Sequence, residues 1–151
     1  MQTLKIQTTW GKLTLTLKGD QVVLCALPLL TETPREAFSI NGFHCLEDLL
    51  QTFPNLGQPE GTEFQRAVWR ELTTIPRGQT RTYGQIAKAI GRPQAVRAVG
   101  SACGANPLPL FIPCHRVTAK NGLGGFGSGL PWKKLLLELE GWSKGVLEQW
   151  N

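Results

Sequence analysis

Apolar and polar residues alternate near the start of the chain with the two-residue period of a β-strand that buries one face. The alternating apolar positions are Leu13, Leu15 and Leu17, and Gly19-Asp20 follows as a turn. Two flanking runs rich in apolar and β-branched residues predict further strands, over residues 4–9 and 21–27. The N-terminal part is therefore expected to hold a small sheet.

A change from strand to helix periodicity follows this sheet. Residues 43–53 predict a helix whose apolar face carries Leu46, Leu49, Leu50 and Phe53. Residues 54–61, with two prolines and two glycines, are the best linker candidate. We therefore expect an N-terminal α/β lobe over residues 1–55 and a second domain over residues 56–151.

The second domain is expected to be mostly helical. Thr62 with Gln65, and Thr82 with Gln85, have the spacing of a capping box, which marks the first turn of a helix. Behind the first box, apolar residues recur at helical spacing at Phe64, Val68, Leu72 and Ile75. The pattern predicts a helix that ends before Pro76 and a shorter helix that begins near Thr82.

A pair of short helices joined through Gly91 and Pro93 is a candidate helix-turn-helix. Pro93 fits the first turn of the second helix, expected over residues 93–106. This helix is lined with Ala, Gly and Ser, and Arg97 should protrude from it. Small residues suit ordinary helix packing, and they equally suit close approach to a nucleic-acid backbone.

The run "PLFIPCHRV" at 109–117 contains the most reactive side chains of the sequence. Residues 110–112 resemble a short buried strand, and Cys114 and His115 follow directly after Pro113. An imidazole that takes the thiol proton would generate a nucleophilic thiolate. Adjacent strand residues point to opposite faces, so the pair needs a turn or a bridging water to interact. The adjacency alone also fits a buried structural cysteine beside an unrelated histidine.

The last predicted helix begins at Pro131 and ends at Gly141, with Leu136 and Leu139 facing inward. Glu140 lies in its final turn, where a carboxylate opposes the helix macrodipole. Such a position fits an exposed acid, or a carboxylate that pairs with His115.

A glycine-rich loop separates the reactive residues from this helix. Five of the eight residues at 122–129 are glycine, and Gly122, Gly124 and Gly127 form G-x-G-x-x-G. The following helix begins only after the glycines, and no second strand pattern follows it, so a dinucleotide site is not expected. The loop instead offers backbone N–H groups to a flat polar ligand.

Charge is divided unequally along the chain, whose net charge is +5. Residues 1–60 hold four basic and six acidic residues, a balance of −2, whereas residues 61–151 hold twelve and five, a balance of +7. The basic half indicates an anionic partner or simply a solvated basic surface. No segment is apolar enough for a membrane span or signal peptide. We therefore expect a cytoplasmic protein with four reduced cysteines: Cys25, Cys45, Cys103 and Cys114.

Taken in order, the motifs of residues 61–141 resemble the O6-alkylguanine-DNA alkyltransferase family. The resemblance is carried by "GTEFQRAVW", "IPRGQTRTYGQIA", "RAVG", "NP", "PCHRV" and the final "EG". It implies an α+β fold with a small RNase H-like α/β lobe and a mostly helical, winged-helix-like domain that contains the helix-turn-helix. It also implies direct, single-turnover DNA repair of O6-methylguanine and O4-methylthymine, with no cofactor, by a monomer bound to the minor groove of double-stranded DNA.

The resemblance also assigns roles to individual residues. Cys114 would accept the alkyl group, His115 would relay its proton through a water, Glu140 would bond to His115, and Asn106 would join the helix-turn-helix to the reactive segment. Base contacts would come from Tyr83, the carbonyls of Cys114 and Val117, and the amide of Gly127, and Arg97 would enter the base stack. The chain differs from the family at Phe126, where tyrosine is frequent, and at Ser128, where glycine is common, which leaves its range of alkyl groups open.

Two other functions are compatible with parts of this pattern. A non-enzymatic DNA lesion binder of similar fold would have the cysteine replaced, and a Cys-His hydrolase would need an oxyanion hole and repeated turnover. A structural zinc site could draw on Cys25, His44 and Cys45, but these are three ligands without the usual spacing. We therefore expect no metal.

Overall fold

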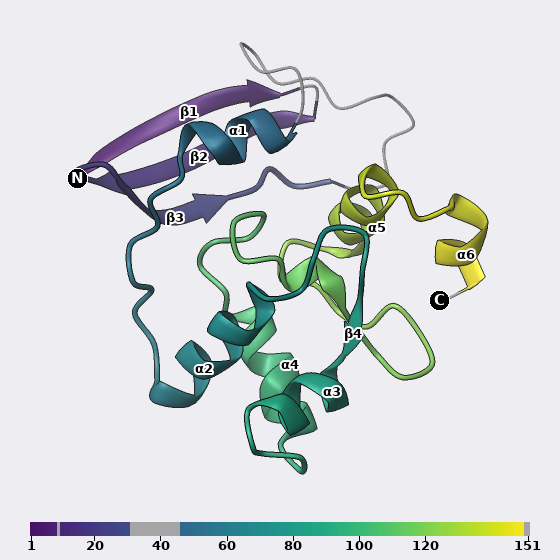
Figure 1. The fold of residues 1–151 in the computed structure, drawn as a ribbon. Helices are drawn as coiled ribbons and strands as arrows, with labels where there is room; N and C mark the ends of the chain where they lie inside the picture. Colours follow the sequence, from purple (N-terminus) through teal and green to yellow (C-terminus); the bar gives the residue numbers. More distant parts are fainter. Residues whose placement is uncertain (9, 31–45, 150–151) are drawn as a thin grey trace.

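A three-stranded antiparallel sheet forms the N-terminal part of the computed structural model, which describes residues 1–8, 10–30 and 46–149 (Figure 1). The strands lie in the order β1, β2, β3 and comprise Gln2–Thr8, Gly11–Lys18 and Gln21–Ala26. This sheet confirms the strands predicted from alternation. Leu13, Leu15 and Leu17 are all buried on one face of β2.

Helix α1, Leu46–Thr52, follows the sheet and packs into the same core through Leu49, which is completely buried. The predicted helix is confirmed over these residues, and its expected first residues, 43–45, lie outside the described part of the chain. The segment predicted as a linker, residues 54–61, is hydrogen-bonded to strand β3 near the N-terminal end of the segment. Val22 donates from its amide to the Asn55 carbonyl and accepts from the Gly57 amide, both at 2.9 Å.

Helices α2, Glu63–Leu72, and α3, Tyr83–Ala89, begin at the two predicted capping boxes. Thr62 Oγ1 accepts from the Gln65 amide at 3.0 Å, and the Gln65 side chain accepts from the Thr62 amide at 2.9 Å. The second box repeats this pattern at 3.1 and 2.9 Å. Each cap of this kind stabilises its helix by about 1 kcal/mol. Ile75 is buried, but it lies after the end of α2.

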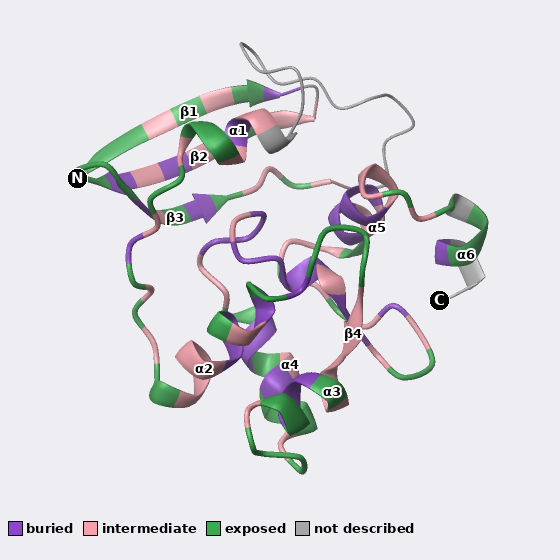
Figure 2. Cartoon of the chain, viewed as in Figure 1, coloured by how far each residue is buried: buried purple, intermediate pink, exposed green. Residues whose placement is uncertain are grey.

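Helix α4, Val96–Gly104, packs against both α2 and α3 (Figure 1). It begins later than the sequence predicts, because Pro93 lies in a turn in which the Ala95 amide donates to the Arg92 carbonyl at 2.9 Å. The expected position of Pro93 inside the first helical turn is therefore wrong. Buried positions concentrate where α2 and α4 face each other (Figure 2).

The strand expected at residues 110–112 is absent, and turns occupy these positions. Leu110 has a positive φ of 76°, which reverses the chain direction instead of extending it. Pro109 and Pro113 on either side have no amide hydrogen for a strand ladder. A short hydrophobic run bounded by two prolines therefore forms a buried turn.

The C-terminal part continues from the 3₁₀ turn η1, Cys114–Arg116, into the two-residue strand β5, Val117–Thr118. Strand β5 pairs in parallel with β4, Arg81–Thr82. Helix α5, Leu130–Leu139, begins one residue before the predicted Pro131, and helix α6, Lys144–Gln149, is an addition that the sequence pattern does not predict. The expected mixture of helix and sheet is confirmed.

One main core connects the sheet to the helical part. Its buried members come from both parts of the chain: from β2, β3 and α1, and from α2, α3, α4, η1, β5 and α5. Two hydrogen bonds fix the end of β3: the Cys25 amide donates to the Pro107 carbonyl at 2.9 Å, and Trp132 Nε1 donates to the Pro28 carbonyl at 2.6 Å. The two halves thus hold each other in a defined position. None of the described helices has the length and apolar character needed to cross a bilayer.

Candidate active site

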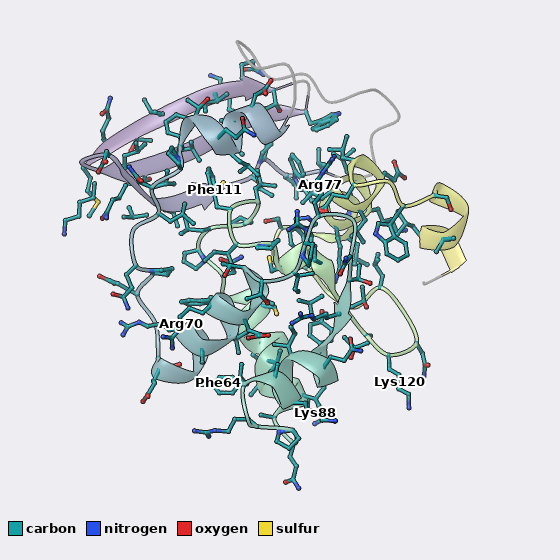
Figure 3. The ribbon with its side chains drawn as sticks, in the orientation of Figure 1. Phe64, Arg70, Arg77, Lys88, Phe111 and Lys120 are labelled. Carbon is teal, nitrogen blue, oxygen red and sulfur yellow. The ribbon has the colours of Figure 1, made fainter. Side chains whose placement is uncertain are left out.

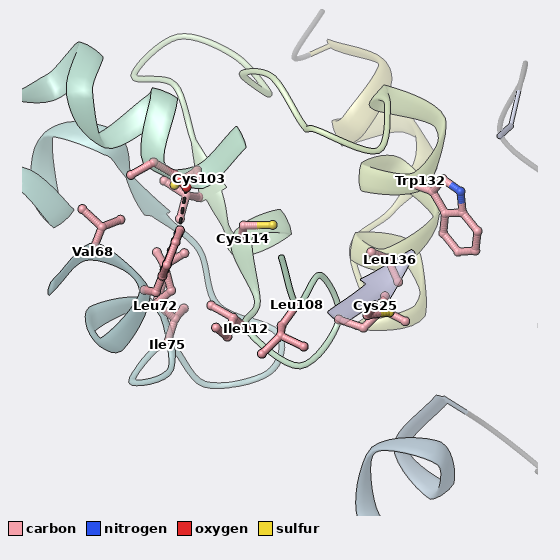
Figure 4. Close-up of a cluster of buried hydrophobic side chains, with 14 of the residues drawn as sticks. Cys25, Val68, Leu72, Ile75, Cys103, Leu108, Ile112, Cys114, Trp132 and Leu136 are labelled. Atoms are coloured by element: carbon pink, nitrogen blue, oxygen red, sulfur yellow. Dashed lines mark hydrogen bonds between the residues drawn. The ribbon is translucent and has the colours of Figure 1, made fainter. Parts of the chain in front are cut away.

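Cys114 and His115 lie in the turn η1, and not in a strand, which would point them to opposite faces. The Cys114 amide donates to the Ile112 carbonyl at 2.8 Å, and the Arg116 amide donates to the Pro113 carbonyl at 3.0 Å. Both side chains are almost fully buried, with 4% and 2% of their surface exposed. Figure 4 shows Cys114 within the core, beside Leu108 and Cys103.

His115 forms a buried pair with Glu140, the residue that caps the C-terminal end of α5. His115 Nε2 and Glu140 Oε1 are 2.6 Å apart. Burial lowers the pKa of His115, so its neutral form dominates at pH 7 even though the carboxylate favours the cation. An ionised carboxylate only accepts hydrogen bonds, so Nε2 carries the ring proton and Nδ1 keeps a free lone pair.

The remaining ring nitrogen, His115 Nδ1, is buried and has no hydrogen-bond partner among the described residues. A buried nitrogen lone pair without a partner is costly in a structural site. It is the atom that a base requires for taking a proton. His115 therefore has its proton on Nε2, and its Nδ1 is available to accept a proton as a general base.

Arg116 is a second hydrogen-bond donor to the carboxylate of Glu140. The Nε of Arg116 donates to Oε1 at 2.7 Å and to Oε2 at 3.0 Å, and its Nη1 donates to the Ile75 carbonyl at 2.9 Å. Burial acts to raise the pKa of Glu140, but His115 and Arg116 outweigh it and leave the pKa below its ordinary value. The carboxylate therefore stays ionised although it opposes the macrodipole of α5.

The thiol of Cys114 needs such a base. Burial raises its pKa to about 11, while a hydrogen bond from the Asn106 amide and the charge of Lys133 act to lower it. The group is therefore a protonated thiol at neutral pH, and reaction as a nucleophile requires loss of its proton.

Asn106 joins α4 to the reactive turn. Its Nδ2 donates to the Ile112 carbonyl at 2.9 Å, and its Oδ1 accepts from the Leu108 amide at 2.9 Å. These bonds close the loop that contains Leu110 with its positive φ. Asn106 thus fixes the backbone on which Cys114 is carried.

A cavity of about 600 Å³, here called the α4 cavity, has Cys114 in its wall. Its other walls come from Tyr83 at the start of α3, from Arg97 on α4, and from the glycine-rich loop with Phe126 and Gly127. The volume lies within the roughly 300–1,000 Å³ of small-molecule sites. Arg97 is exposed, so the cavity extends from solvent to the buried thiol.

The loop passes so close to its neighbours that two positions need glycine. A Cβ at Gly127 would lie 2.8 Å from the Gly104 carbonyl oxygen at the end of α4. A Cβ at Gly124, where φ is +75°, would lie 2.7 Å from the Tyr83 hydroxyl. These close approaches bring backbone polar groups of the loop to the cavity beside Cys114.

A comparison with known protein families gives this geometry a context. The family model "6-O-methylguanine DNA methyltransferase, DNA binding domain" matches residues 63–142, which is more than half of the chain. The chain belongs to this family. The resemblance noted from the sequence motifs is thereby confirmed.

Individual proteins with names that match this family are also similar to the chain in sequence and in structure. The chain is 56% identical over 93 residues to a methylated-DNA–protein-cysteine methyltransferase of Methanosarcina acetivorans; the match covers 61% of this chain and 60% of that relative. The crystal structure of Mycobacterium tuberculosis OGT in complex with DNA is similar with a TM-score of 0.70 and 36% identity, over 89% of this chain and 92% of that one. The O6-methylguanine methyltransferase structure from the same organism gives 0.72 and 36%, over 91% of each chain.

Most of the residues expected to act in this family lie around one point in the structure. Cys114, Tyr83, Arg97, Phe126 and Gly127 line the α4 cavity. Behind it, His115, Glu140 and Asn106 make the contacts described above, and Ser128 lines a neighbouring cavity. The Val117 carbonyl already accepts from Lys133 at 2.5 Å, so any contact with a base would use its second lone pair. The roles of these residues in a reaction stay predictions.

Two charged residues of the site, Arg116 and Lys133, are not among those expected from the sequence. Lys133 is completely buried, and its Nζ donates to the Gly125 carbonyl at 2.9 Å as well as to Val117. The ammonium also lies 5.8 Å from the centre of the Tyr83 ring. The sequence contains a pattern from which the inward position of Lys133 could have been predicted. Lys133, Leu136 and Glu140 are spaced by three and four residues and so share one helical face. Arg116 directly follows the reactive pair.

Burial lowers the pKa of Lys133 to about 8, against the opposing influence of the Cys114 and Cys103 thiols. We expect Lys133→Met to slow alkyl transfer by about tenfold at pH 7, because a nearby positive charge stabilises the thiolate of Cys114. In the wild-type chain, this charge is present below pH 8 and is lost as the pH rises through 8. The ratio of wild-type to variant rate should therefore fall across that range in a pH–rate profile.

Lys134→Met is the matched control, since Lys134 neighbours Lys133 on α5 but is only partly buried. Its rate should follow that of the wild-type chain at every pH. A rate ratio for Lys133→Met that stays constant from pH 6 to pH 9 would assign the residue a purely structural role.

No cluster of three or more potential metal ligands occurs among the described residues. Of the three zinc-ligand candidates, Cys25 is a buried free thiol in β3, and His44 and Cys45 lie outside the described part of the chain.

Proposed function

We propose that this chain repairs DNA by transferring the alkyl group of O6-methylguanine, and of O4-methylthymine, to Cys114 in a single turnover without a cofactor. The observation that carries the proposal is a buried thiol at the wall of a base-sized cavity, beside a neutral histidine held by a buried carboxylate. Membership of the 6-O-methylguanine DNA methyltransferase family supports the same chemistry.

The reaction needs one proton transfer and one displacement. The thiol proton passes through a water to His115 Nδ1, and the carboxylate of Glu140, which Arg116 holds in place, stabilises the imidazolium that results. The Cys114 sulfur then attacks the alkyl carbon, the S–C bond forms, and the bond from carbon to O6 breaks. The departing guanine takes up a proton, with Tyr83 as the nearby donor. The thioether product has no route back to a thiol, so each chain acts once.

The base is held by groups around the α4 cavity. In this proposal, the carbonyls of Cys114 and Val117 accept from the exocyclic amine, and the amide of Gly127 faces O6. Phe126 supplies an apolar surface for the base, as a flat aromatic ring suits stacking. Ser128 stands nearer to the alkyl substituent.

DNA contact is proposed for the helices α3 and α4, acting as a helix-turn-helix of a winged-helix-like domain in the minor groove. Lys88, Arg92 and Arg97 are exposed along this pair, and Lys88 projects from α3 into solvent at the end of the molecule opposite the sheet (Figure 3). The similarity to a structure of M. tuberculosis OGT in complex with DNA supports this assignment. Phosphate contacts by such residues give affinity without sequence preference.

The remaining expectations belong to the same proposal. Residues 1–55 form an RNase H-like lobe, residues 56–151 form the DNA-binding and transfer domain, and the protein acts as a cytoplasmic monomer. The lobe is firmly attached to the second domain, because Cys25 on β3 and Pro28 just after it are hydrogen-bonded to Pro107 and Trp132.

The number of methyl groups removed per chain tests this function against its alternatives. An excess of duplex DNA with one O6-methylguanine should lose one methyl group per protein chain and then no more. A non-enzymatic lesion binder would remove none, and a Cys-His hydrolase would act repeatedly. Either of these counts would contradict the proposal.

Arg97→Ala is expected to slow repair of methylated duplex by about tenfold to a hundredfold, because a side chain that fills the vacated stack offsets the few kcal/mol of unstacking. The rate with free O6-benzylguanine, which needs no flipping, should change less than about twofold. Parallel single-turnover rates on the two substrates make the comparison.

The matched control is Arg92→Ala, which removes an exposed arginine of the same helix pair outside the cavity wall. It should weaken binding to all duplexes and leave the rate at saturating DNA unchanged. Equal losses for Arg97→Ala on duplex and on free base would mean that Arg97 shapes the cavity rather than the DNA.

A further inference from the structure

Three leucines that are far apart in the sequence form a small hydrophobic core, here called the second core, which is separate from the main one. Leu123 lies in the glycine-rich loop, Leu137 on α5 and Leu147 on α6, and each has at most 2% of its surface exposed. Trp142, between the two helices, packs against them. Helix α6 follows the residues that match the family model, so the second core joins the glycine-rich loop to a segment outside the matched domain.

The end of α5 reverses the chain so that α6 packs against α5 (Figure 1). Gly141 has a positive φ of 102°, and its amide donates to the Glu138 carbonyl at 3.0 Å. The Trp142 amide donates to the Leu137 carbonyl, also at 3.0 Å. These two bonds form a Schellman motif, in which a glycine ends the helix and turns the chain. Ser143 then caps α6, since its Oγ accepts from an amide of the first turn at 3.3 Å.

Leu123 is the only buried residue in residues 119–129, all of which the structure describes. Residues 123–126 have no regular secondary structure. A glycine-rich backbone loses much conformational freedom when it is ordered, so its position depends on the few contacts that hold it. Burial of the Leu123 side chain between α5 and α6 is such a contact, at the end of the loop nearest to β5.

The loop continues from Leu123 directly to the α4 cavity. The Gly125 carbonyl accepts from Lys133 Nζ at 2.9 Å and from the Tyr83 hydroxyl at 3.3 Å. Gly127 passes close to the last turn of α4, and both glycines line the cavity beside the reactive thiol. The backbone groups at the cavity thus lie only two and four residues after the buried leucine.

We propose that Leu147 of α6 is a positioning residue for alkyl transfer, because it completes the second core that holds Leu123 and thereby fixes the glycine-rich loop at the α4 cavity. Leu147 does not line that cavity and acts only through Leu123. The effect on the reaction rests on the proposed function. The restraint of the loop by α6 does not depend on that function and can be measured separately.

The loop position should matter for every substrate whose base enters the α4 cavity. Loss of the restraint is therefore expected to slow transfer from a methylated duplex and from free O6-benzylguanine alike. Binding of undamaged duplex should not change, since it depends on exposed cationic residues of α3 and α4. This pattern differs from the one expected for Arg97→Ala, which slows repair of the duplex alone.

Leu147→Ala removes most of the α6 contribution to the second core. We expect its single-turnover rate to fall by about tenfold on both substrates, because a small displacement of positioning groups lowers the rate strongly. Backbone hydrogen exchange is measured on the same variant by mass spectrometry of peptides. Exchange in residues 119–129 should become at least about fivefold faster, whereas α2 and the N-terminal sheet should exchange as in the wild-type chain.

Val146→Ala is the matched control, since Val146 neighbours Leu147 on α6 but is 37% exposed and lies outside the second core. It should leave both rates and the exchange of the loop unchanged. Leu147→Met conserves the side-chain volume and should restore wild-type rates. Leu147→Val is a smaller truncation with an intermediate effect, and it tests the proposal if Leu147→Ala does not fold.

A double variant shows whether Leu147 acts through Leu123. Two residues that act through one contact have non-additive effects, so Leu123→Ala with Leu147→Ala should be little slower than Leu123→Ala alone. Additive losses of rate would contradict this route from α6 to the loop.

The exchange and rate measurements separate the possible outcomes. Wild-type exchange of the loop in folded Leu147→Ala would overturn the restraint by α6, and faster loop exchange with unchanged rates would overturn the positioning role. Equally faster exchange throughout the chain would also overturn it, since Leu147 would then affect global stability alone. A wild-type chain that transfers no alkyl group would refute the proposed function, while the exchange comparison would still decide whether α6 restrains the loop.

Discussion

Replacing Cys114 by serine is expected to abolish alkyl transfer, with a loss of at least about 10³-fold, because a hydroxyl is a far weaker nucleophile than a thiolate. Affinity for duplex DNA should stay within about twofold of the wild-type value, since it depends on exposed cationic side chains contacting phosphates. Cys114 is 4% exposed and lies away from such contacts. Transfer is measured in a single turnover with methylated duplex, and binding by fluorescence anisotropy with the same duplex.

The structure supplies a matched control in Cys103, a second buried thiol that also lines the α4 cavity. Burial raises the pKa of Cys103 to about 12, and its neighbours do not include the buried histidine and carboxylate pair. Cys103→Ser should therefore keep transfer within about threefold. A reversed result, with transfer lost in Cys103→Ser and kept in Cys114→Ser, would contradict the assignment of the nucleophile.

Glu140→Gln is expected to slow transfer by about a hundredfold, which is the typical contribution of a general base. The amide can still accept from His115 Nε2, but it has no charge to stabilise the imidazolium. The change also leaves Arg116 without its anionic partner, since both carboxylate oxygens accept from its Nε. Glu138→Gln, on the same helix, is the matched control and should have no effect on the rate.

His115 and Glu140 should also behave as one unit. Residues that act together lose activity non-additively, so His115→Phe with Glu140→Gln should be little slower than His115→Phe alone. A double-mutant cycle of transfer rates gives the coupling. Additive losses would mean that Glu140 affects the protein without acting through His115.

Local signals predict the elements that surround this site. The two capping boxes mark the starts of α2 and α3 because their hydrogen bonds join residues only three apart. The alternation at residues 13–17 predicts β2 because one face of that strand is buried throughout. Such elements depend on residues that are close in the sequence, and the sequence contains the information to recognise them.

Other features depend on contacts that no local pattern contains. Residues 110–112 have the composition of a strand, but Leu110 adopts a positive φ and Asn106 closes the loop. The later start of α4 is due to a turn around Pro93 that competes with the helix. The pairing of Glu140 with His115 could be proposed from their chemistry and from the family resemblance. The burial of Lys133 depends on carbonyls from two separate segments.

The location of the transferred group tests the central claim most directly. Intact-mass and peptide-mass measurements are made on the wild-type chain after reaction with an excess of duplex containing O6-methylguanine. The mechanism predicts a mass increase of one methyl group, found on the peptide with Cys114 and absent from those with Cys25 and Cys103. An unmodified chain after the DNA has lost its methyl group, or a methyl group on another residue, would contradict it.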